Sequence, residues 1–277
     1  MTDRIKQGLI RLRPRNDSIY VSQNRTVLSM ARDGFIHEGV EHGLIVSETR
    51  LLSKYEYRIN GQEPVPVALS NVEQHNWLGY YIFLPKEIHG EVDQGSGMLD
   101  ETTQHTLELK IARFVADGIH EDVDLTNFTQ TPISFELQLS VDADFADIVE
   151  TKRKRHQKGE ILKEWEGTEL RFDYKAEHAY DIQGNKGVAR IHRGLTLQIA
   201  SSDSIPSYEN NVISFQVRLD PLQKWHACIN LIPFIDGERL TNLYGCRSFD
   251  KTTNAYDHKR NTFFREATRF STAESET

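Results

Sequence analysis

The chain has 277 residues, of which 38% are hydrophobic and 27% are charged. This balance is typical of a folded globular protein and excludes an intrinsically disordered chain. The 33 basic and 41 acidic residues give a net charge of −8, whereas proteins that bind nucleic acid present clustered positive charge. A basic run at residues 152–155 stands among acids and favours a solvated loop.

Two cysteines, Cys228 and Cys246, occur in the sequence. Two thiols make neither a disulfide framework nor, by themselves, a tetrahedral zinc site. The sequence does not open like a secretory signal, and no apolar run reaches the length of a membrane span, about 18 residues. We therefore expect a cytoplasmic protein with free thiols and with neither a nucleic-acid nor a membrane partner.

Alternation of apolar and polar residues predicts strands from the first third of the chain onward. The first are expected at residues 51–59, 64–69 and 76–83. Asn60-Gly61 ends the first of these runs and is typical of a tight turn. In the middle of the chain, residues 105–116 and 119–125 alternate on either side of Asp117-Gly118. This dipeptide predicts a hairpin, because both central positions of a type I′ turn need a positive φ.

The remaining strands are expected between residues 133 and 232. Residues 133–141 alternate, and Leu170, Phe172 and Tyr174 share one face. We expect a hairpin across Arg193-Gly194, and the last strands at residues 212–219 and 225–232.

So many half-buried strands predict an all-β fold, a large antiparallel β-sandwich of two packed sheets. The chain shows no repeat at a fixed period, which disfavours a propeller. We place the sandwich in residues 1–245. Residues 246–277 follow as a linker and a short helix.

The tail carries apolar residues at helical spacing, namely Phe263, Phe264, Ala267 and Phe270. A short helix with an uncovered apolar face indicates a missing partner. The alternative is a helix that docks on the sandwich of the same chain.

Acidic residues 142–150 are the most conspicuous polar segment. Asp142, Asp144 and Asp147 offer oxygen ligands for calcium, but the spacing is not that of an EF-hand, and capping of a turn is the favoured interpretation. Glycoside hydrolysis needs two carboxylates. Several acids qualify formally, and none stands in a distinctive catalytic motif: Glu121, Asp144, Asp147, Glu150 and Glu164.

Histidines and aromatic residues give two further hypotheses. His37, His42 and His75 lie close to glutamates, but Gly39 and Gly43 disfavour a helix that would align them, and we expect no metal site. Exposed aromatic rings stack on sugars, and residues 76–83 contain Trp77, Tyr80 and Tyr81. Burial in the core is the alternative for these three side chains.

Three stretches resemble the N-terminal domain of bacterial and cyanobacterial glycogen debranching enzymes of the amylo-α-1,6-glucosidase type. They are residues 43–61, which contain Glu48-Thr49-Arg50, residues 143–150, which read Ala-Asp-Phe-Ala-Asp-Ile-Val-Glu, and residues 118–127. The resemblance extends over residues 25–235. Glu48 stands where the family has Asp, and Val149 where it has Phe.

The resemblance implies a β-sandwich that precedes an (α/α)6 barrel, and in these enzymes the barrel holds the catalytic carboxylates. Residues 246–277 then lead toward an absent barrel, in a truncated chain or in the product of a split gene. The parent enzyme would be a glycoside hydrolase, while this chain would be inactive alone. The residues proposed to face and position the barrel are Glu48, Arg50, Glu121, Asp144, Asp147 and Glu150, although a buried ion pair is the alternative for Arg50.

The resulting hypothesis is a non-catalytic scaffold and substrate-positioning domain of an α-glucan debranching glycosidase. It needs no cofactor or metal, and its partner is the catalytic barrel, in cis or as a separate chain. The first alternative is an independent glucan-binding β-sandwich module that uses Trp77, Tyr80 and Tyr81. The second is a complete small glycosidase, which the lack of an identifiable catalytic pair disfavours.

Overall fold

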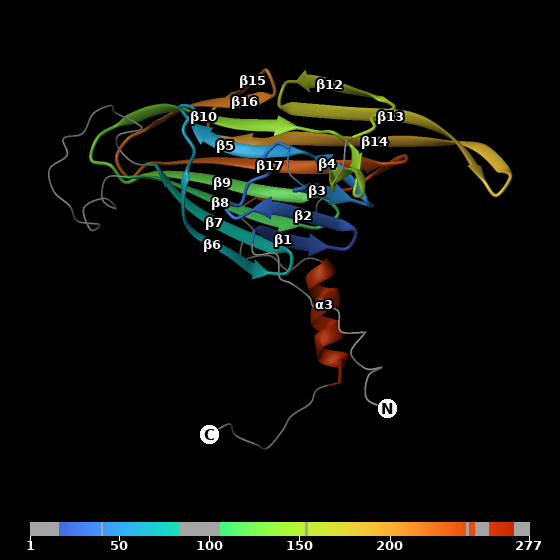
Figure 1. Ribbon diagram of the computed structural model, residues 1–277. Coiled ribbons are helices and arrows are strands. Elements are labelled where there is room, and N and C mark those ends of the chain that lie inside the picture. Colours follow the sequence, from blue (N-terminus) through green and yellow to red (C-terminus); the bar gives the residue numbers. More distant parts are fainter. Residues whose placement is uncertain are drawn as a thin grey trace, which may run out of the picture.

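The computed structural model consists mostly of β-strands (Figure 1), and alternation of apolar and polar side chains accounts for them. In β10 (Ile133–Asp142), every second residue from Ile133 to Val141 is buried. Successive side chains of a strand point to opposite faces, so this pattern turns one face of β10 toward the core. The structure describes residues 17–39, 41–83, 106–152, 155–241, 244–246 and 255–268.

One layer of the fold is an antiparallel sheet of nine strands. Its spatial order is β12 (Glu160–Glu166), β13 (Glu169–Ile182), β14 (Asn185–Ser202), β17 (Lys224–Ile235), β9 (Ile119–Asn127), β8 (Leu107–Val115), β7 (Asn76–Phe83) and β6 (Val65–Glu73), with the short β18 (Glu238–Arg239) paired to β17.

The second layer consists of two smaller antiparallel sheets. The four-stranded sheet has the order β15 (Pro206–Glu209), β16 (Val212–Leu219), β10, β5 (Lys54–Ile59). The five-stranded sheet has the order β1 (Ser18–Gln23), β2 (Thr26–Ala31), β3 (Gly43–Val46), β4 (Thr49–Leu52), β11 (Ala146–Asp147). A single residue, Ser53, separates β4 from β5, so the chain passes there from one sheet to the other.

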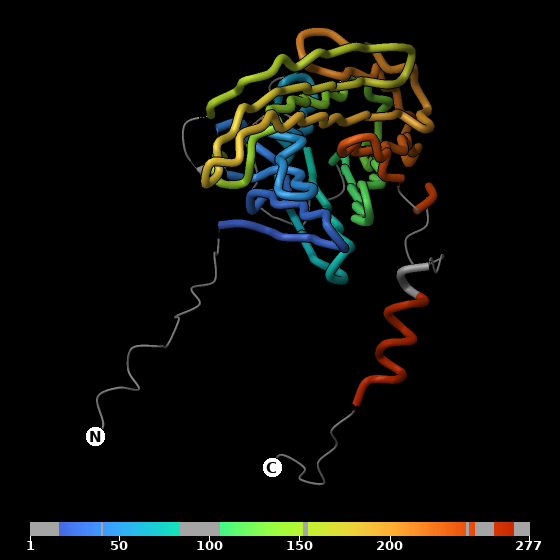
Figure 2. The backbone as a smooth tube through the Cα atoms, turned by 90° about the vertical axis from the view of Figure 1, so that its right-hand side faces the viewer, coloured from blue at the N-terminus to red at the C-terminus, as the bar shows by residue number. Residues whose placement is uncertain are grey.

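Figures 1 and 2 show the two layers facing each other, and the large hydrophobic core lies between them. Leu44, Leu139 and Leu197 come from the three different sheets and belong to the same buried cluster. The predicted all-β antiparallel sandwich is therefore confirmed. The two sheets expected from the sequence correspond to two layers, and one of these layers consists of two separate sheets.

A short helix, α3 (Ala255–Glu266), lies below the sandwich in Figure 1. Arg260 of the helix forms an ion pair with Glu73 of β6, while the side chains of Phe263 and Phe264 are 65% and 56% exposed. The short helix expected in the tail is thus present. Phe270 lies outside the described residues. Among the described helices, none is long and apolar enough to cross a membrane.

The hairpin expected across Arg193-Gly194 is wrong. Residues 185–202 form the single strand β14, and the chain turns before it, at Gln183 and Gly184, whose φ angles are 53° and 84°. Gly194 lies within the strand because its neighbours approach closely. A Cβ atom there would lie 3.1 Å from the carbonyl oxygen of Phe172 and 3.3 Å from the Cβ of Phe234.

The hairpin expected at Asp117-Gly118 is confirmed, but its turn type is not. β8 and β9 pair directly, yet neither Asp117 nor Gly118 has a positive φ. The connection has three residues, and the Ala116 N–H donates to the Gly118 carbonyl at 2.8 Å. Glycine is required at 118 because a Cβ atom would lie 2.4 Å from the carbonyl oxygen of Leu231.

The turn at Asn60-Gly61 has the two positive φ angles of a type I′ turn, 48° and 79°. However, the strand that follows does not pair with β5. It crosses to the edge of the nine-stranded sheet as β6.

A buried ion pair lies in the interior of the sandwich. Arg113 on β8 and Glu121 on β9 are directly opposite in the register, and their side chains are 2% and 1% exposed. The Arg113 Nε donates to Glu121 Oε2, and Arg113 Nη1 donates to the Gly34 carbonyl. The other oxygen of Glu121 accepts the hydroxyls of Tyr55 and Tyr57 at 2.6 and 2.5 Å.

Aromatic rings enclose the guanidinium group of Arg113. Its central carbon lies 4.8 Å from the ring centre of Trp77, 5.5 Å from that of Tyr55 and 6.0 Å from that of Phe35. These contacts are cation–π interactions in a desolvated environment. Burial, followed by the Glu121 carboxylate, raises the pKa of Tyr55 well above its ordinary value, so its hydroxyl remains a donor.

We expect Glu121→Ala to lower the free energy of unfolding by about 3–5 kcal/mol, because it leaves the buried charge of Arg113 uncompensated. The double variant Glu121→Leu/Arg113→Met removes both charges and is expected to recover most of this loss. Urea unfolding of both variants measures the difference. Equal unfolding midpoints for the single and double variants would contradict this account.

Candidate functional site

Arg50 joins two distant segments at the edge of the five-stranded sheet. Its Nε donates to Asp144 Oδ1 at 3.1 Å, and its Nη2 donates to Asp144 Oδ2 at 2.5 Å. A third donor, Nη1, reaches the His42 carbonyl at 3.3 Å. The planar guanidinium group thus makes the two parallel bonds that only arginine offers to a carboxylate. We call this contact, with the turn of residues 144–150, the Arg50 junction.

Arg155 stabilises the same turn from the other side. It forms an ion pair with Glu150, and its Nη2 donates to the carbonyls of Asp144 and Phe145 at 3.1 and 3.0 Å. Burial opposes the ionisation of Glu150, but Arg155 and two backbone N–H groups outweigh it and lower the pKa of this carboxyl group. Asp147 caps the turn by accepting the Val149 N–H at 2.8 Å.

Glu48 takes part in the Arg50 junction through its backbone. It follows Ser47 in the turn between β3 and β4, where both residues have a positive φ, 46° and 65°. Its carbonyl accepts the Ile148 N–H at 2.9 Å, and its side chain is exposed. The exchange of Asp for Glu at this position therefore leaves the observed backbone contact unaffected.

The structure brings five of the six proposed positioning residues together: Glu48, Arg50, Asp144, Asp147 and Glu150. Glu121 lies apart from them in the sandwich interior, where it pairs with Arg113. Within the described residues, the side-chain groups that could hold a metal ion do not include the acids of residues 142–150. These acids instead accept backbone N–H groups or pair with Arg50, Arg155 and Lys163.

Two of the three proposed sugar-binding residues are buried. Trp77 and Tyr81 have no exposed surface, so neither ring offers a face to a sugar. Their physical role is visible instead: Trp77 covers Arg113, and the Tyr81 hydroxyl donates to the Asp33 carbonyl at 2.5 Å. Tyr80 points to the opposite face of β7 and is partly exposed.

His37 lies between two carboxylates. Its Nδ1 is 3.0 Å from Glu56 Oε2, and its Nε2 is 2.7 Å from Asp33 Oδ2. Burial lowers the pKa of His37, but the bonds to Glu56 and Asp33 outweigh burial, so the net effect raises the pKa from 6.5. In the described part of the chain, two groups of side chains have the spacing of metal ligands, and neither of them contains His37, His42 or His75.

A shallow hollow of about 500 Å³ adjoins the Arg50 junction. Its lining includes Tyr20, His42, Ile148 and Thr151. Tyr20 and Ile148 are 45% and 42% exposed, and the neighbouring Val149 is 58% exposed. The Arg50 junction therefore presents apolar side chains beside a polar hollow.

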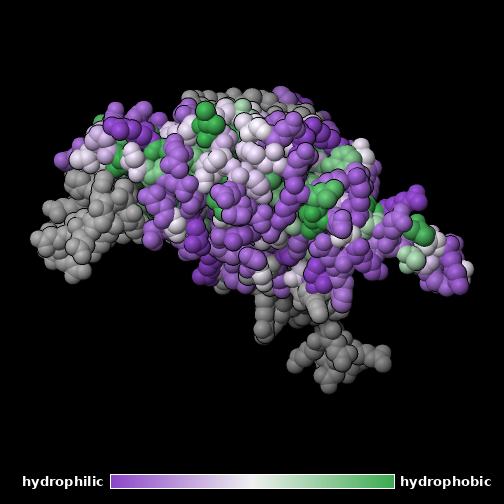
Figure 3. Space-filling view, turned by 90° about the horizontal axis from the view of Figure 1, so that it is seen from above, coloured by the Kyte–Doolittle hydropathy of each residue, from purple (hydrophilic) through white to green (hydrophobic). Residues whose placement is uncertain are grey.

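A hairpin projects from the same end of the fold as the Arg50 junction, where Arg193 of β14 donates to the Thr49 hydroxyl at 3.4 Å. β13 and β14 continue past the sandwich, and residues 177–190 form the projecting hairpin seen on the right of Figure 1. Tyr180, Ile182 and Val188 on it are 40%, 65% and 58% exposed. Seen from above in Figure 3, most of the surface is hydrophilic, and hydrophobic residues stand in small separate groups, one of them on the projecting hairpin.

The fold is that of a large β-sandwich domain. Its Arg50 junction joins two of the segments that carry the resemblance, residues 43–61 and 143–150. Residues 21–230 match the family described as the N-terminal domain of (some) glycogen debranching enzymes, and the chain belongs to this family. The match contains every residue of the Arg50 junction. No curated protein matches the chain.

Several solved structures are similar to the chain at low scores. A protein described as a kojibiose phosphorylase from the human microbiome has a TM-score of 0.43 and 9% identity over 91% of this chain, which spans only 31% of that protein. A galactose mutarotase-like protein from Lactobacillus casei ATCC 334 has a TM-score of 0.36 and 8% identity over 78% of this chain and 100% of its own length. A polysaccharide lyase has a TM-score of 0.33 and 12% identity, over 83% of this chain and 32% of its own length. At these scores, nothing about function follows.

We expect Arg50→Ala to lower the free energy of unfolding by about 2 kcal/mol, because it removes two charge-assisted hydrogen bonds from a nearly buried pair. Arg50→Lys keeps the charge but loses the fork, and an intermediate loss is expected. Urea unfolding measures both. Arg190→Ala, which removes an exposed pair with Glu177, is the matched control and should leave stability unchanged within error.

His37 predicts a pH-dependent contribution to stability. A pKa that is higher in the folded state means that protonation favours folding, so the contribution is complete below the unfolded pKa and is lost as the pH rises through the folded pKa. Lys54 and Arg58 also face Glu56. We expect His37→Gln to be less stable than the wild type at about pH 6, with the difference vanishing by about pH 9. Thermal unfolding across this range measures it, and a difference that grows with pH would refute the assignment.

Proposed function

We propose that this chain is a non-catalytic scaffold domain that holds and orients the catalytic (α/α)6 domain of an α-glucan debranching enzyme, in cis or as a separate chain. Membership of a family of N-terminal domains supports a further domain as the partner. The proposal places the enzyme in the cytoplasm, which the free thiols favour.

The projecting hairpin is the observation that carries the proposal. An isolated two-stranded hairpin is marginally stable in water, and exposed apolar groups at its tip favour contact with a partner. The strands are registered without interruption from Glu169 opposite Gln198 to Ile182 opposite Asn185. The hairpin is therefore a rigid extension of the sheet, suited to hold another domain at a fixed angle.

The Arg50 junction supplies a second element of the same interface in this proposal. Arg50 and Arg155 fix the turn that presents Ile148 and Val149 at the surface. Because the turn is held by ion pairs and backbone hydrogen bonds, its exposed apolar residues are preorganised for contact. Positioning of the glucan then follows indirectly, through the placement of the catalytic domain.

The alternative is an independent glucan-binding module. The specific observation in its favour is a polar hollow of about 630 Å³ at the base of the projecting hairpin, lined by residues that include Lys175, Glu177, Arg190 and His192. Hydroxyl groups of a sugar would find donors and acceptors there. Burial of Trp77 and Tyr81 removes two of the three stacking residues on which this alternative was based.

The first test is calorimetric titration of the purified chain with glycogen and maltooligosaccharides, with glucose release assayed in the same samples. A scaffold domain gives neither heat nor glucose. Saturable heat without glucose would favour the binding module. Reproducible glucose release, absent from a heat-denatured sample, would contradict both.

The second test adds the (α/α)6 domain of the enzyme and measures association and glucose release. Val188→Asp is expected to weaken association by at least about tenfold, because it places a charge in the proposed apolar contact. Val67→Asp is the matched control, since Val67 is equally exposed, at 62%, on the distant edge strand β6. Equal effects of the two variants would exclude the projecting hairpin as the contact.

A further inference from the structure

The outer face of the nine-stranded sheet carries a cluster of metal-binding side chains. On β9 and β17, alternate residues that face away from the core lie directly opposite one another in three pairs: His120 with Asn230, Asp122 with Cys228, and Asp124 with His226. Glu121, between two of them, points to the other face and into the sandwich. The cluster is therefore separate from the buried Arg113–Glu121 pair and from the Arg50 junction.

Both histidines are oriented by an oxygen atom on the opposite strand. His120 Nδ1 lies 2.9 Å from Asn230 Oδ1, and His226 Nδ1 lies 2.8 Å from Asp124 Oδ1. Asn230 Nδ2 donates to Gln198, which leaves Asn230 Oδ1 as the acceptor for His120. Each Nδ1 is thus the protonated nitrogen, and each Nε2 presents a lone pair. This arrangement is the one that fixes the tautomer of metal-binding histidines.

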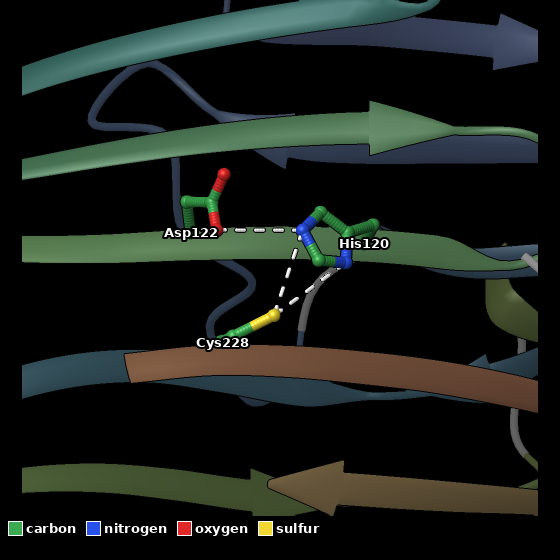
Figure 4. Close-up of side chains that lie close together, drawn as sticks. All are labelled: His120, Asp122 and Cys228. Atoms are coloured by element: carbon green, nitrogen blue, oxygen red, sulfur yellow. Dashed lines mark hydrogen bonds and ion pairs between the residues drawn. The ribbon is translucent and has the colours of Figure 1, made fainter. Parts of the chain in front are cut away.

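The Nε2 atoms are directed at the middle pair of the cluster. His120 Nε2 lies 3.4 Å from Asp122 Oδ1 and 3.6 Å from Cys228 Sγ, as Figure 4 shows. His226 Nε2 lies 3.7 Å from the same Asp122 oxygen and 2.9 Å from Cys246 Sγ. The donor atoms of His120, Asp122 and Cys228 all lie within 4.8 Å of one another, and so do those of Asp122, His226 and Cys246.

These separations agree with a tetrahedral metal site. Bonds of about 2.0–2.1 Å from zinc to nitrogen or oxygen and about 2.3 Å to sulfur imply ligand–ligand separations of about 3.3–3.8 Å, the largest being between two sulfur atoms. The distances from His120 Nε2 to Asp122 and to Cys228 already match these values. The three side chains are 1%, 4% and 2% exposed, and the surrounding strands hold them in place.

We propose that His120, Asp122 and Cys228 bind a Zn²⁺ ion and that Cys246 supplies the fourth ligand. Cys246 interacts with both Asp122 and Cys228 and lies outside the strands, so a small movement of its segment closes the ligand set. Imidazole and thiolate donors favour zinc over magnesium and calcium, which prefer oxygen. Until the ion binds, His226 acts as a positioning residue, because its Nε2 accepts the S–H of Cys246 and holds this thiol beside the cluster.

A site with four protein ligands is a structural zinc site and does not require an open position for substrate. Its effect would be to fasten residues 244–246 to the sheet. Tyr244 already packs there, with its ring centre 4.9 Å from that of Phe114 and 6.0 Å from that of His75. Zinc would thereby fix the part of the chain that leads from the sandwich toward α3.

The test is zinc binding by the whole chain, kept reduced with a phosphine. Competition with a chromophoric chelator gives affinity and stoichiometry, and Co²⁺ replaces Zn²⁺ for spectroscopy. We expect one ion per chain and, with Co²⁺, thiolate charge-transfer absorption and the intense d–d bands of a tetrahedral site. Cys228→Ser and His120→Gln should each weaken binding by at least about 100-fold, and Asn230→Ala by about tenfold through loss of the bond that orients His120.

The buried variants Cys228→Ser and His120→Gln could prevent folding of the sheet. Cys246→Ser still tests the proposal in that case, because Cys246 is exposed. It should weaken binding by at least about tenfold and shift the charge-transfer absorption. His192→Gln is the matched control, since His192 also pairs with a carboxylate, Asp173, but lies outside the cluster. Absence of a bound ion, or equal binding by His192→Gln and Cys246→Ser, would overturn the proposal.

Discussion

The Arg113–Glu121 pair constrains how the two layers of this sandwich meet. Both charges are fully buried, and the cost of burying them is offset only when further hydrogen bonds accompany the ion pair. The partners come from elements far apart in the sequence: Gly34 before β3, Tyr55 and Tyr57 on β5, and the pair itself on β8 and β9. The pair therefore fixes the position of the divided layer against the continuous one. A shift of one residue in β8 or β9 would turn one charge out of the core and leave the other uncompensated.

Division of the second layer explains where the surface features lie. Because the chain changes sheets at Ser53, β4 lies near the edge of the five-stranded sheet, and only the two-residue strand β11 pairs with its outer side. The Arg50 junction covers this edge, and its ion pairs take the place of the backbone hydrogen bonds that a longer strand would make. At the same end, β13 and β14 extend beyond their neighbours and become the projecting hairpin. The two surfaces that we connect with the catalytic domain thus arise from strands of unequal length.

Local patterns in the sequence predicted the strands well and their connections less well. Alternation identified β10, β7 and β16, because one face of each is buried. Gly194 was interpreted as a turn residue, but it serves close packing against Phe172 and Phe234, which no local pattern reveals. The motif that contains Arg50 and the acids after residue 142 correctly singled out residues that meet in space. Glu121 was grouped with them, although alternation places it on the apolar face of its strand with Ile119 and Val123, which indicates a position in the core. The cluster of His120, Asp122, Cys228 and Cys246 was missed, since its members are spread over about half of the chain and only the register of β9 with β17 brings them together.

The unbroken course of β14 has a mechanical consequence. Its 18 residues run from the tip of the projecting hairpin into the nine-stranded sheet, and β13 accompanies it in register from Asn185 to Gln198. Both strands continue out of the sheet without a break, so the direction of the hairpin follows the twist of the sheet and not a linker. A load applied at the tip is carried as shear by the backbone hydrogen bonds of both strands. The hairpin therefore acts as a lever arm without a hinge, and its angle to the sandwich is determined by the sheet from which it extends.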